Sequence, residues 1–174
     1  MKKQVETVLN MSKLERNEMP LNLKVTNVRE LIKSIAESFR LIVNERNGSL
    51  TTEFNATQYN FLIDEFHISN ALINLLDNAN KDCPETPEIK LTTRNEGNWY
   101  VIEISDKGMG MDTQNKSKIF EKFFREETGN IHNVKGQGLG LSYVKKIIEN
   151  HKGQISVDSH KGKGSSFTIK LPMV

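Results

Sequence analysis

The sequence contains a single cysteine, Cys83, among its 174 residues. One cysteine excludes an intramolecular disulfide and is typical of a reducing compartment. Because no other metal-binding side chains cluster around it in the sequence, the thiol is expected to be structural. A disulfide-stabilised secreted domain is therefore excluded, and a soluble cytoplasmic domain is expected.

The chain also lacks long hydrophobic runs and an excess of charge of one sign. No apolar stretch approaches the about 20 residues that span a bilayer, and the N-terminus lacks the apolar core of a signal peptide. The 24 basic and 22 acidic side chains give a net charge of +2. We therefore expect no nucleic acid as a partner and no direct membrane contact. The length fits one domain with a substantial core.

Hydrophobic periodicity predicts an irregular alternation of helices and strands. Helices are expected from Asn27 to Asn47, from Asp64 to about Lys81, near Gln114 to Phe120, and from Gly140 through His151. Strands are expected at 21–25, 49–54, 59–63, 88–94, 99–105, 153–159 and 165–171. The pattern predicts an α+β fold, a two-layer α/β sandwich: a mixed, mostly antiparallel sheet of about five or more strands with about three helices on one face.

The second of these helices has an unusual polar stripe. At spacings of three and four, which put side chains on one face, it carries His67, Asn70, Asn74, Asn78 and Lys81. Amide oxygens of asparagine suit magnesium, which bridges phosphate oxygens. Lys81, one turn beyond Asn78, offers a positive charge to the same phosphates.

A solvated face with incidental asparagines is the alternative, and the helix by itself favours it. Asp77, the nearest acid, is turned about 100° away from Asn78 around the helix axis. His67 is expected at the surface and receives no role.

A first glycine turn, Asp106 to Gly110, follows the strand 99–105. Glycines allow a sharp turn and a close approach to a ligand. An aspartate facing such a turn can accept a hydrogen bond from an exocyclic amine such as that of adenine. The same pattern occurs in ordinary turns and in calcium loops, but Lys107 and Met109 do not supply the further oxygen ligands that calcium needs.

A second glycine cluster, Gly136 to Gly140, precedes an apolar-periodic helix. Glycine amides at a helix start form an anion site that the helix dipole assists. A P-loop would need lysine and then serine or threonine after the last glycine, and Leu141 and Ser142 do not fit. A dinucleotide fold would place the glycines after the first strand of a βαβ unit, whereas here they follow a polar loop.

Between the two glycine turns lie three phenylalanines, Phe120, Phe123 and Phe124. Such a cluster is typical of a core, and it also suits the anchor of a lid. The stretch 126–135 is polar and aperiodic, so mobility is expected there.

Together these elements resemble the ATP-binding catalytic domain of sensor histidine kinases, within the superfamily that includes gyrase, the Hsp90 chaperone and MutL. The resemblance covers about residues 21–174. Four boxes carry it in the family's order, 74–81 (NLLDNANK), 106–110 (DKGMG), 120–124 (FEKFF) and 136–141 (GQGLGL), and the ending 162–172 (GKGSSFTIKLP) is also similar. Each box is a weak pattern, whereas four in order are a strong one.

The resemblance implies roles position by position. Asn74 and Asn78 would hold magnesium, Lys81 would touch phosphate, and Asp106 would read the adenine amine. The phenylalanines would anchor the lid, and the second glycine cluster would cover the phosphates. The full set implied to contact ATP or magnesium is Asn74, Asn78, Lys81, Asp106, Gly108, Gly110, Met111, Phe120, Phe123, Phe124, Lys135, Gly136, Gln137, Gly138, Leu139, Gly140, Leu141 and Thr168. Many such kinases stack an aromatic residue on adenine after the lysine of the first box; here that position is Asp82, which predicts modest nucleotide affinity.

Hydrolytic members of the superfamily resemble one another in a glutamate four residues before the metal-binding asparagine. This chain has Asn74 there, and a neutral amide cannot take a proton from water. Transfer to a nucleophile is therefore favoured over hydrolysis. In sensor kinases the nucleophile is a histidine followed by an acid, on an earlier helix. The four histidines, His67, His132, His151 and His160, do not match this pattern.

Residues 1–19 resemble the end of the preceding dimerisation-domain helix and a linker, and 20–174 the catalytic domain. The first hypothesis is thus a protein-histidine kinase domain, inactive in autophosphorylation by itself, with that dimerisation domain and a response regulator as partners. An inner-membrane sensor is left open as the parent protein. The alternatives are a stand-alone serine kinase of the anti-sigma type, which the helix remnant disfavours, and a non-catalytic docking module, which the intact boxes disfavour.

Overall fold

A computed structural model of the protein describes residues 20–124 and 138–174. Several expectations fall outside these ranges and stay predictions. They concern the helix remnant and linker at 1–19, the polar segment 126–135, and Lys135, Gly136 and Gln137.

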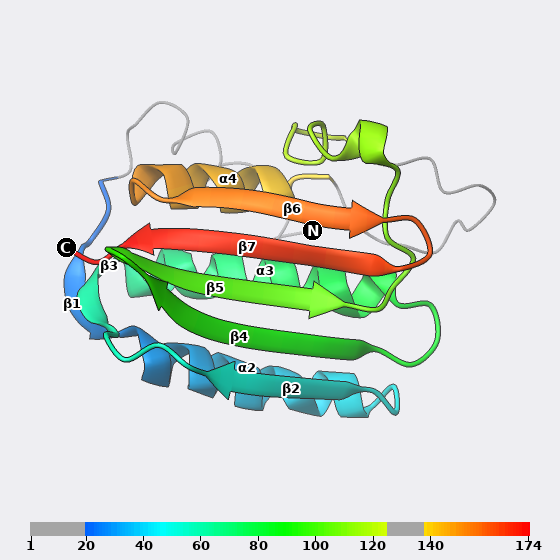
Figure 1. Ribbon diagram of the computed structural model, residues 1–174, viewed down its shortest axis with the longest axis horizontal. Coiled ribbons are helices and arrows are strands. Elements are labelled where there is room, and N and C mark those ends of the chain that lie inside the picture. The colour runs from blue at the N-terminus through cyan, green and yellow to red at the C-terminus, as the bar shows by residue number, and fades with distance from the viewer. Residues whose placement is uncertain (1–19, 125–137) are drawn as a thin grey trace, which may run out of the picture.

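The described residues form a five-stranded sheet, a separate two-stranded ladder and three helices (Figure 1). The sheet has the order β2-β4-β5-β7-β6, with β2 (Ser49–Phe54) parallel to β4 (Glu88–Glu96). The other neighbours pair antiparallel: β5 (Trp99–Asp106), β7 (Gly164–Pro172) and β6 (Gln154–His160). The small antiparallel ladder joins β1 (Lys24–Asn27) to β3 (Asn60–Ile63).

The helices are α2 (Val28–Asn44), α3 (Glu65–Asp82) and α4 (Gly140–Asn150), and all three lie behind the sheet in Figure 1. The predicted α+β sandwich is confirmed. Two predicted helix starts are also confirmed by their caps. The side chain of Asn27 accepts a hydrogen bond from the backbone N–H of Glu30 at 3.1 Å, and that of Asp64 accepts from His67 at 3.0 Å.

One predicted helix is wrong. Near Gln114 to Phe120 the chain forms a single 3-10 turn, Thr113–Asn115, followed by further turns. None of the three residues in the 3-10 turn is buried, although Ile119 is. So short a segment with almost no apolar face gains too little from packing to hold a helix.

The core lies between the helices and the inner face of the sheet. On β5, Tyr100, Ile102 and Ile104 point inward, and on β7 the residues paired with them in register do the same. α3 supplies Leu72, Leu75 and Leu76, all fully buried. Burying each such aliphatic side chain stabilises the fold by about 1.5–3 kcal/mol.

The outer face of the sheet is polar. Arg94 contacts Glu96 and Glu103, and Lys170 also contacts Glu96. Because β5 alternates between the two faces, Asp106 is its last inward residue, placed at the strand end next to the C-terminal end of α3.

Candidate functional site

Asp106 is a buried carboxylate at the end of β5, and it is only 6% exposed. Its Oδ1 accepts hydrogen bonds from the backbone N–H of Gly108 at 2.8 Å and of Ser165 at 3.3 Å. Its Oδ2 is buried without a hydrogen-bond partner among residues 20–124 and 138–174. Burial raises the pKa of the Asp106 carboxyl, and the two N–H donors offset part of this shift. The site therefore holds an acceptor whose second oxygen lacks a donor, as an exocyclic amine would supply.

The glycine turn after Asp106 is held on two sides. On one side, a Cβ at Gly108 would lie 2.5 Å from the carbonyl oxygen of Asp82, which accepts the Met109 N–H at 2.9 Å. On the other, Gly110 has a φ of 62°, and a Cβ there would overlap the carbonyl oxygen of His160. Only glycine fits at these approaches. The turn is thereby fixed between the end of α3 and the β6–β7 hairpin.

Met111 continues this contact into the core. It is buried, and its N–H donates to Ser159 Oγ at 2.9 Å. Ser159 Oγ in turn lies 2.9 Å from Ser165 Oγ, next to the N–H that reaches Asp106. The start of β7 is thus part of the site, although the sequence reasoning gave Ser165 no role.

Asn74 and Asn78 lie half-buried on α3, one turn apart. The amide nitrogen Nδ2 of Asn74 donates to the carbonyl oxygen of Asn70 at 2.8 Å, which orients the amide. Its oxygen faces the start of α4, since a Cβ at Gly140 would lie 3.1 Å from Asn74 Oδ1. The Asn78 side chain has no hydrogen bond within the described ranges, so both amides keep ligand capacity.

Lys81 forms an ion pair with Asp77, four residues earlier on α3. Both side chains are more than a third exposed, and such pairs are worth about 0–1 kcal/mol. Because the pair is weak, a phosphate group can compete with Asp77 for the ammonium group. The role of Lys81 at phosphate stays a prediction.

The N-terminus of α4 lies next to Asn74. In the described part of the chain the helix has no side-chain cap, and its Ncap residue, Leu139, is buried. Gly140 and Leu141 form the first turn, whose N–H groups lack helical partners and carry the positive end of the helix dipole. This end is suited to an anion, and it lies on the side of α3 that carries the asparagines.

The phenylalanine segment meets the second glycine cluster through its backbone. The Phe123 N–H donates to the Gly138 carbonyl at 3.0 Å, and Gly138 has a φ of 68° with no room for a Cβ beside Phe123. Phe120 packs edge-on against Phe167 at 6.4 Å between ring centroids, and Phe124 also packs on the core.

Phe123 differs from its expected role as a third anchor, because its side chain is 69% exposed. A φ of 61° places it in the left-handed region, where the chain turns and directs the ring outward. The backbone of Phe123, and not its ring, makes the contact with Gly138.

Two further residues lie elsewhere than expected. Thr168 pairs in register with Glu103, whose carboxylate belongs to the outer face of the sheet, so the structure does not bring Thr168 together with Asp106. His67, expected at the surface, is 5% exposed. The sequence could not reveal this, because the residue that covers it, Tyr143, is 76 positions away.

Arg46 is a further residue that the sequence did not single out. From the turn after α2 it donates to the carbonyl oxygens of Asn80, in the last turn of α3, and of Cys83 and Glu85, just after the helix. It therefore satisfies carbonyls that the helix leaves open, next to the Asp82 carbonyl that holds the glycine turn. Its partners are 34 to 39 positions away, so no local pattern marks it.

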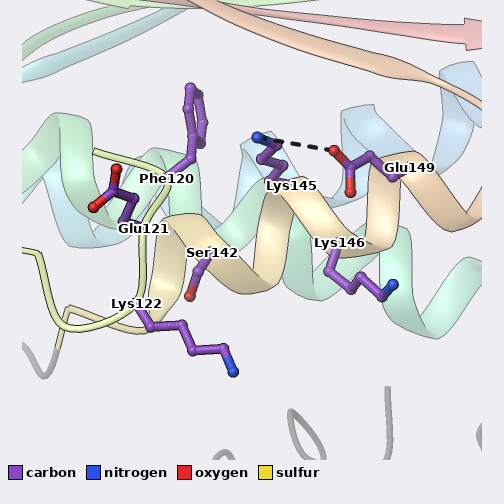
Figure 2. Close-up of a pocket in the computed structure, with 7 residues that line it drawn as sticks. All are labelled: Phe120, Glu121, Lys122, Ser142, Lys145, Lys146 and Glu149. Atoms are coloured by element: carbon purple, nitrogen blue, oxygen red, sulfur yellow. Dashed lines mark ion pairs between the residues drawn. The ribbon is translucent and has the colours of Figure 1, made fainter. Parts of the chain in front are cut away.

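A groove of about 430 Å³ is lined by residues of α4 and of the segment 120–122 (Figure 2). Lys145 is paired with Glu149 at 3.9 Å, and its ammonium lies 5.9 Å from the centre of the Phe120 ring. The lining residues are Phe120, Glu121, Lys122, Ser142, Lys145, Lys146 and Glu149. The groove does not include Asp106 or the asparagines, so we separate it from the candidate site.

The donor set of the site fits magnesium through amide oxygens. No group of three or more histidine, cysteine, aspartate or glutamate side chains gathers into a metal site among the described residues. Within the same residues, no helix has the length and apolar content to cross a membrane. Asn74 and Asn78 supply neutral oxygen ligands, which suit a magnesium ion that shares its shell with water and phosphate.

Comparison with known proteins places these features in a family. Residues 63–174 match the family described as Histidine kinase-, DNA gyrase B-, and HSP90-like ATPase. The chain belongs to this family. It is 43% identical over 173 residues to the sensor protein RprX of Bacteroides fragilis (strain YCH46), covering 98% of this chain and 33% of RprX. The chain thus spans about a third of the length of this relative.

Solved structures of histidine kinases are similar as well. The catalytic domain of the histidine kinase ThkA superposes with a TM-score of 0.77 at 27% identity, covering 88% of this chain and 97% of that chain. A structure of ThkA in complex with the response regulator protein TrrA gives a TM-score of 0.78 at 25% identity, covering 99% and 48%. The domain is a histidine kinase ATPase catalytic domain of the kind found in two-component sensor kinases.

Proposed function

We propose that this domain binds ATP with magnesium and donates the γ-phosphoryl group to a histidine on a separate dimerisation domain. One observation carries the proposal: the buried Oδ2 of Asp106, which has no partner among the described residues, lies at the end of β5 beside a turn that two glycines allow to pack closely between α3 and the β6–β7 hairpin. A buried acceptor without a donor costs about 1–3 kcal/mol. A ligand amine removes that cost, and adenine carries such an amine.

Asn74 and Asn78 are the proposed magnesium ligands, and the first turn of α4 is the proposed phosphate site. Asn74 Oδ1 already faces Gly140, so a metal ligand and a helix N-terminus meet at one place. When bound, magnesium would neutralise charge on the phosphate oxygens during transfer. The part of this chain is to hold the phosphates in line and to keep them in a defined position.

The same residues argue against hydrolysis. Activation of water needs a base, and the position one turn before Asn78 is Asn74, whose amide cannot accept a proton from water. The nearest carboxylate on α3, Asp77, is paired with Lys81. Without a base for water, the γ-phosphoryl group awaits a nucleophile that another domain delivers.

The proposed partners follow from the family. A dimerisation domain would carry the acceptor histidine, and a response regulator would receive the phosphoryl group next. ThkA forms a complex with the response regulator TrrA, and this chain is similar to ThkA over most of its length. We propose the corresponding pair of partners here, with the parent protein a sensor kinase whose other parts lie outside this chain.

Calorimetry tests the binding part of the proposal. ATP is expected to bind the wild-type domain more tightly with magnesium than with a chelator present. In a second assay, γ-labelled ATP is expected to leave no label on this chain by itself. Absence of ATP binding would refute the proposal, and acid-labile label on this chain would show that an acceptor histidine lies within it. Acid-stable label on an added protein would favour the serine kinase.

A further inference from the structure

A buried polar contact joins α4 to α3 next to the asparagine stripe. The hydroxyl of Tyr143 lies 3.0 Å from Nδ1 of His67, and the side chains are 8% and 5% exposed. Burial raises the pKa of Tyr143 to about 12, and a hydrogen bond from Asn70 opposes this shift. The neutral hydroxyl therefore links α4 directly to His67 on α3.

This contact lies one helical turn from Gly140 on α4 and two turns from Asn74 on α3. Tyr143 follows Gly140 by three residues, and its backbone N–H bonds to the carbonyl oxygen of Leu139 at 3.0 Å, so it belongs to the first turn of α4. On α3, the backbone carbonyl of Asn70 accepts the Asn74 Nδ2–H, and His67 lies one turn before Asn70. The Tyr143 hydroxyl thus connects the turn that bears Gly140 to the helix that carries and orients the Asn74 amide.

We propose that Tyr143 is a positioning residue for the phosphate and magnesium end of the site, acting through His67. This inference rests on the proposed function. Its role is to hold the N-terminus of α4 at a fixed distance from Asn74 Oδ1, so that one bound phosphate reaches both the helix amides and a metal held by Asn74.

The arrangement of α4 explains why one hydroxyl has this effect. Within the described residues the helix start has no side-chain cap, so its position depends on packing, on the Phe123 N–H bond to the Gly138 carbonyl and on the Tyr143 contact. Of the other buried residues of α4, Ser142 donates its hydroxyl to the Leu139 carbonyl of the helix start itself, and Val144, Ile147 and Ile148 are apolar and fully buried. Apolar packing is tolerant of small shifts, whereas a hydrogen bond specifies distance and direction.

The test is the ratio of ATP affinities with magnesium and with a chelator, measured by calorimetry. Tyr143→Phe keeps the ring and removes the hydroxyl. We expect its affinity with magnesium to fall about three- to tenfold, the equivalent of one lost buried hydrogen bond, with little change in the chelator. His67→Leu is expected to lower the ratio equally, and adding Tyr143→Phe to it should have no further effect.

Two variants serve as controls. Tyr100→Phe removes a buried hydroxyl from β5 at the opposite end of the strand from Asp106, and it should leave both affinities unchanged. His67→Gln keeps a hydrogen-bonding group for Tyr143 and should restore the ratio. Thermal melting shows that each variant is folded, and His67→Leu carries the test if Tyr143→Phe does not fold.

The outcomes separate this inference from the proposed function. An unchanged ratio in folded Tyr143→Phe, or equal losses with magnesium and with the chelator, would overturn the positioning role while ATP binding by the wild type stands. A wild-type domain that binds no ATP, or binds it without any effect of magnesium, would overturn the proposed function and this inference with it.

Discussion

The substitution Asp106→Asn separates nucleotide binding from folding. In the folded domain, Oδ1 of Asp106 accepts two backbone N–H groups and Oδ2 accepts none within residues 20–124 and 138–174. Asparagine can keep its amide oxygen toward Gly108 and Ser165. Its NH₂ group then replaces the free oxygen and presents a donor where the adenine amine is also a donor.

The expected loss of ATP affinity follows from this exchange. A hydrogen bond to a charged acceptor contributes about 1.5–3 kcal/mol, so its loss corresponds to a dissociation constant for ATP that is about 10- to 150-fold larger. The opposition of two donors adds to the loss. The affinity is read by calorimetry with magnesium present, and Asp158→Asn, which changes an exposed carboxylate on β6, is the matched control with no expected effect.

Asp106→Asn should not lower the stability of the domain, although it lowers ATP affinity. Burial raises the pKa of Asp106 in the folded domain above its unfolded value of about 3.9. The carboxyl therefore favours the fold fully below that value, and this contribution is lost as pH rises through the folded pKa. At pH 7 the Asn variant should resist urea at least as well as the wild type. A folded Asn variant that binds ATP within about twofold of the wild type would refute the assignment of Asp106 to adenine.

Three further predictions concern the metal, the glycine turn and the junction between helices. Asn78→Ala should remove most of the effect of magnesium on ATP affinity, and an unchanged magnesium dependence would show that Asn78 is no ligand. Gly110→Ala places a Cβ against the His160 carbonyl at a positive φ, whereas Gly97→Ala has a positive φ but open space around its Cβ. Gly97→Ala should lower the free energy of unfolding in urea by about 1–2 kcal/mol, and Gly110→Ala should lower it by more. Equal losses would contradict the close packing of the glycine turn. Nε2 of buried His151 accepts the Asp64 N–H at 2.9 Å, and burial lowers the pKa of His151. The contribution of His151 to stability should therefore be complete above about pH 6.5, and it should fall below that pH because the unfolded chain takes up the proton first. His151→Gln should flatten the unfolding free energy in that pH window, and the same slope in both proteins would exclude His151 as its cause.

The sequence predicted the fold because its local signals agree with one another. Asn27 and Asp64 cap the helices that the apolar stripes predict, and the alternation along 99–105 continues to Asp106 on the inner face. The order of the four motifs along the chain indicated the family, which composition and periodicity could not do. The expected helix near Gln114 was wrong because its only apolar residues, Ile119 and Phe120, stand next to each other at its end and give the segment no apolar stripe along a helix.

The parts of the site that could not be predicted depend on contacts across the fold. Arg46 and Tyr143 act on α3 from 34 and 76 positions away, and nothing around either residue marks that contact. The family resemblance implied that Thr168 contacts the cofactor, whereas strand alternation places it on the outer face of the sheet with Glu103. The Phe123 side chain points outward because its φ is positive, and the neighbouring residues in the sequence do not predict that angle.

The central claim is that this chain is a phosphoryl donor whose acceptor lies on another domain. Its most direct test mixes the domain with a separately produced dimerisation domain of the parent protein and γ-labelled ATP with magnesium. We expect acid-labile, base-stable label on a histidine of the dimerisation domain, absent when the donor carries Asn78→Ala. No label at any donor concentration, with ATP binding intact, would contradict the claim and favour a docking module.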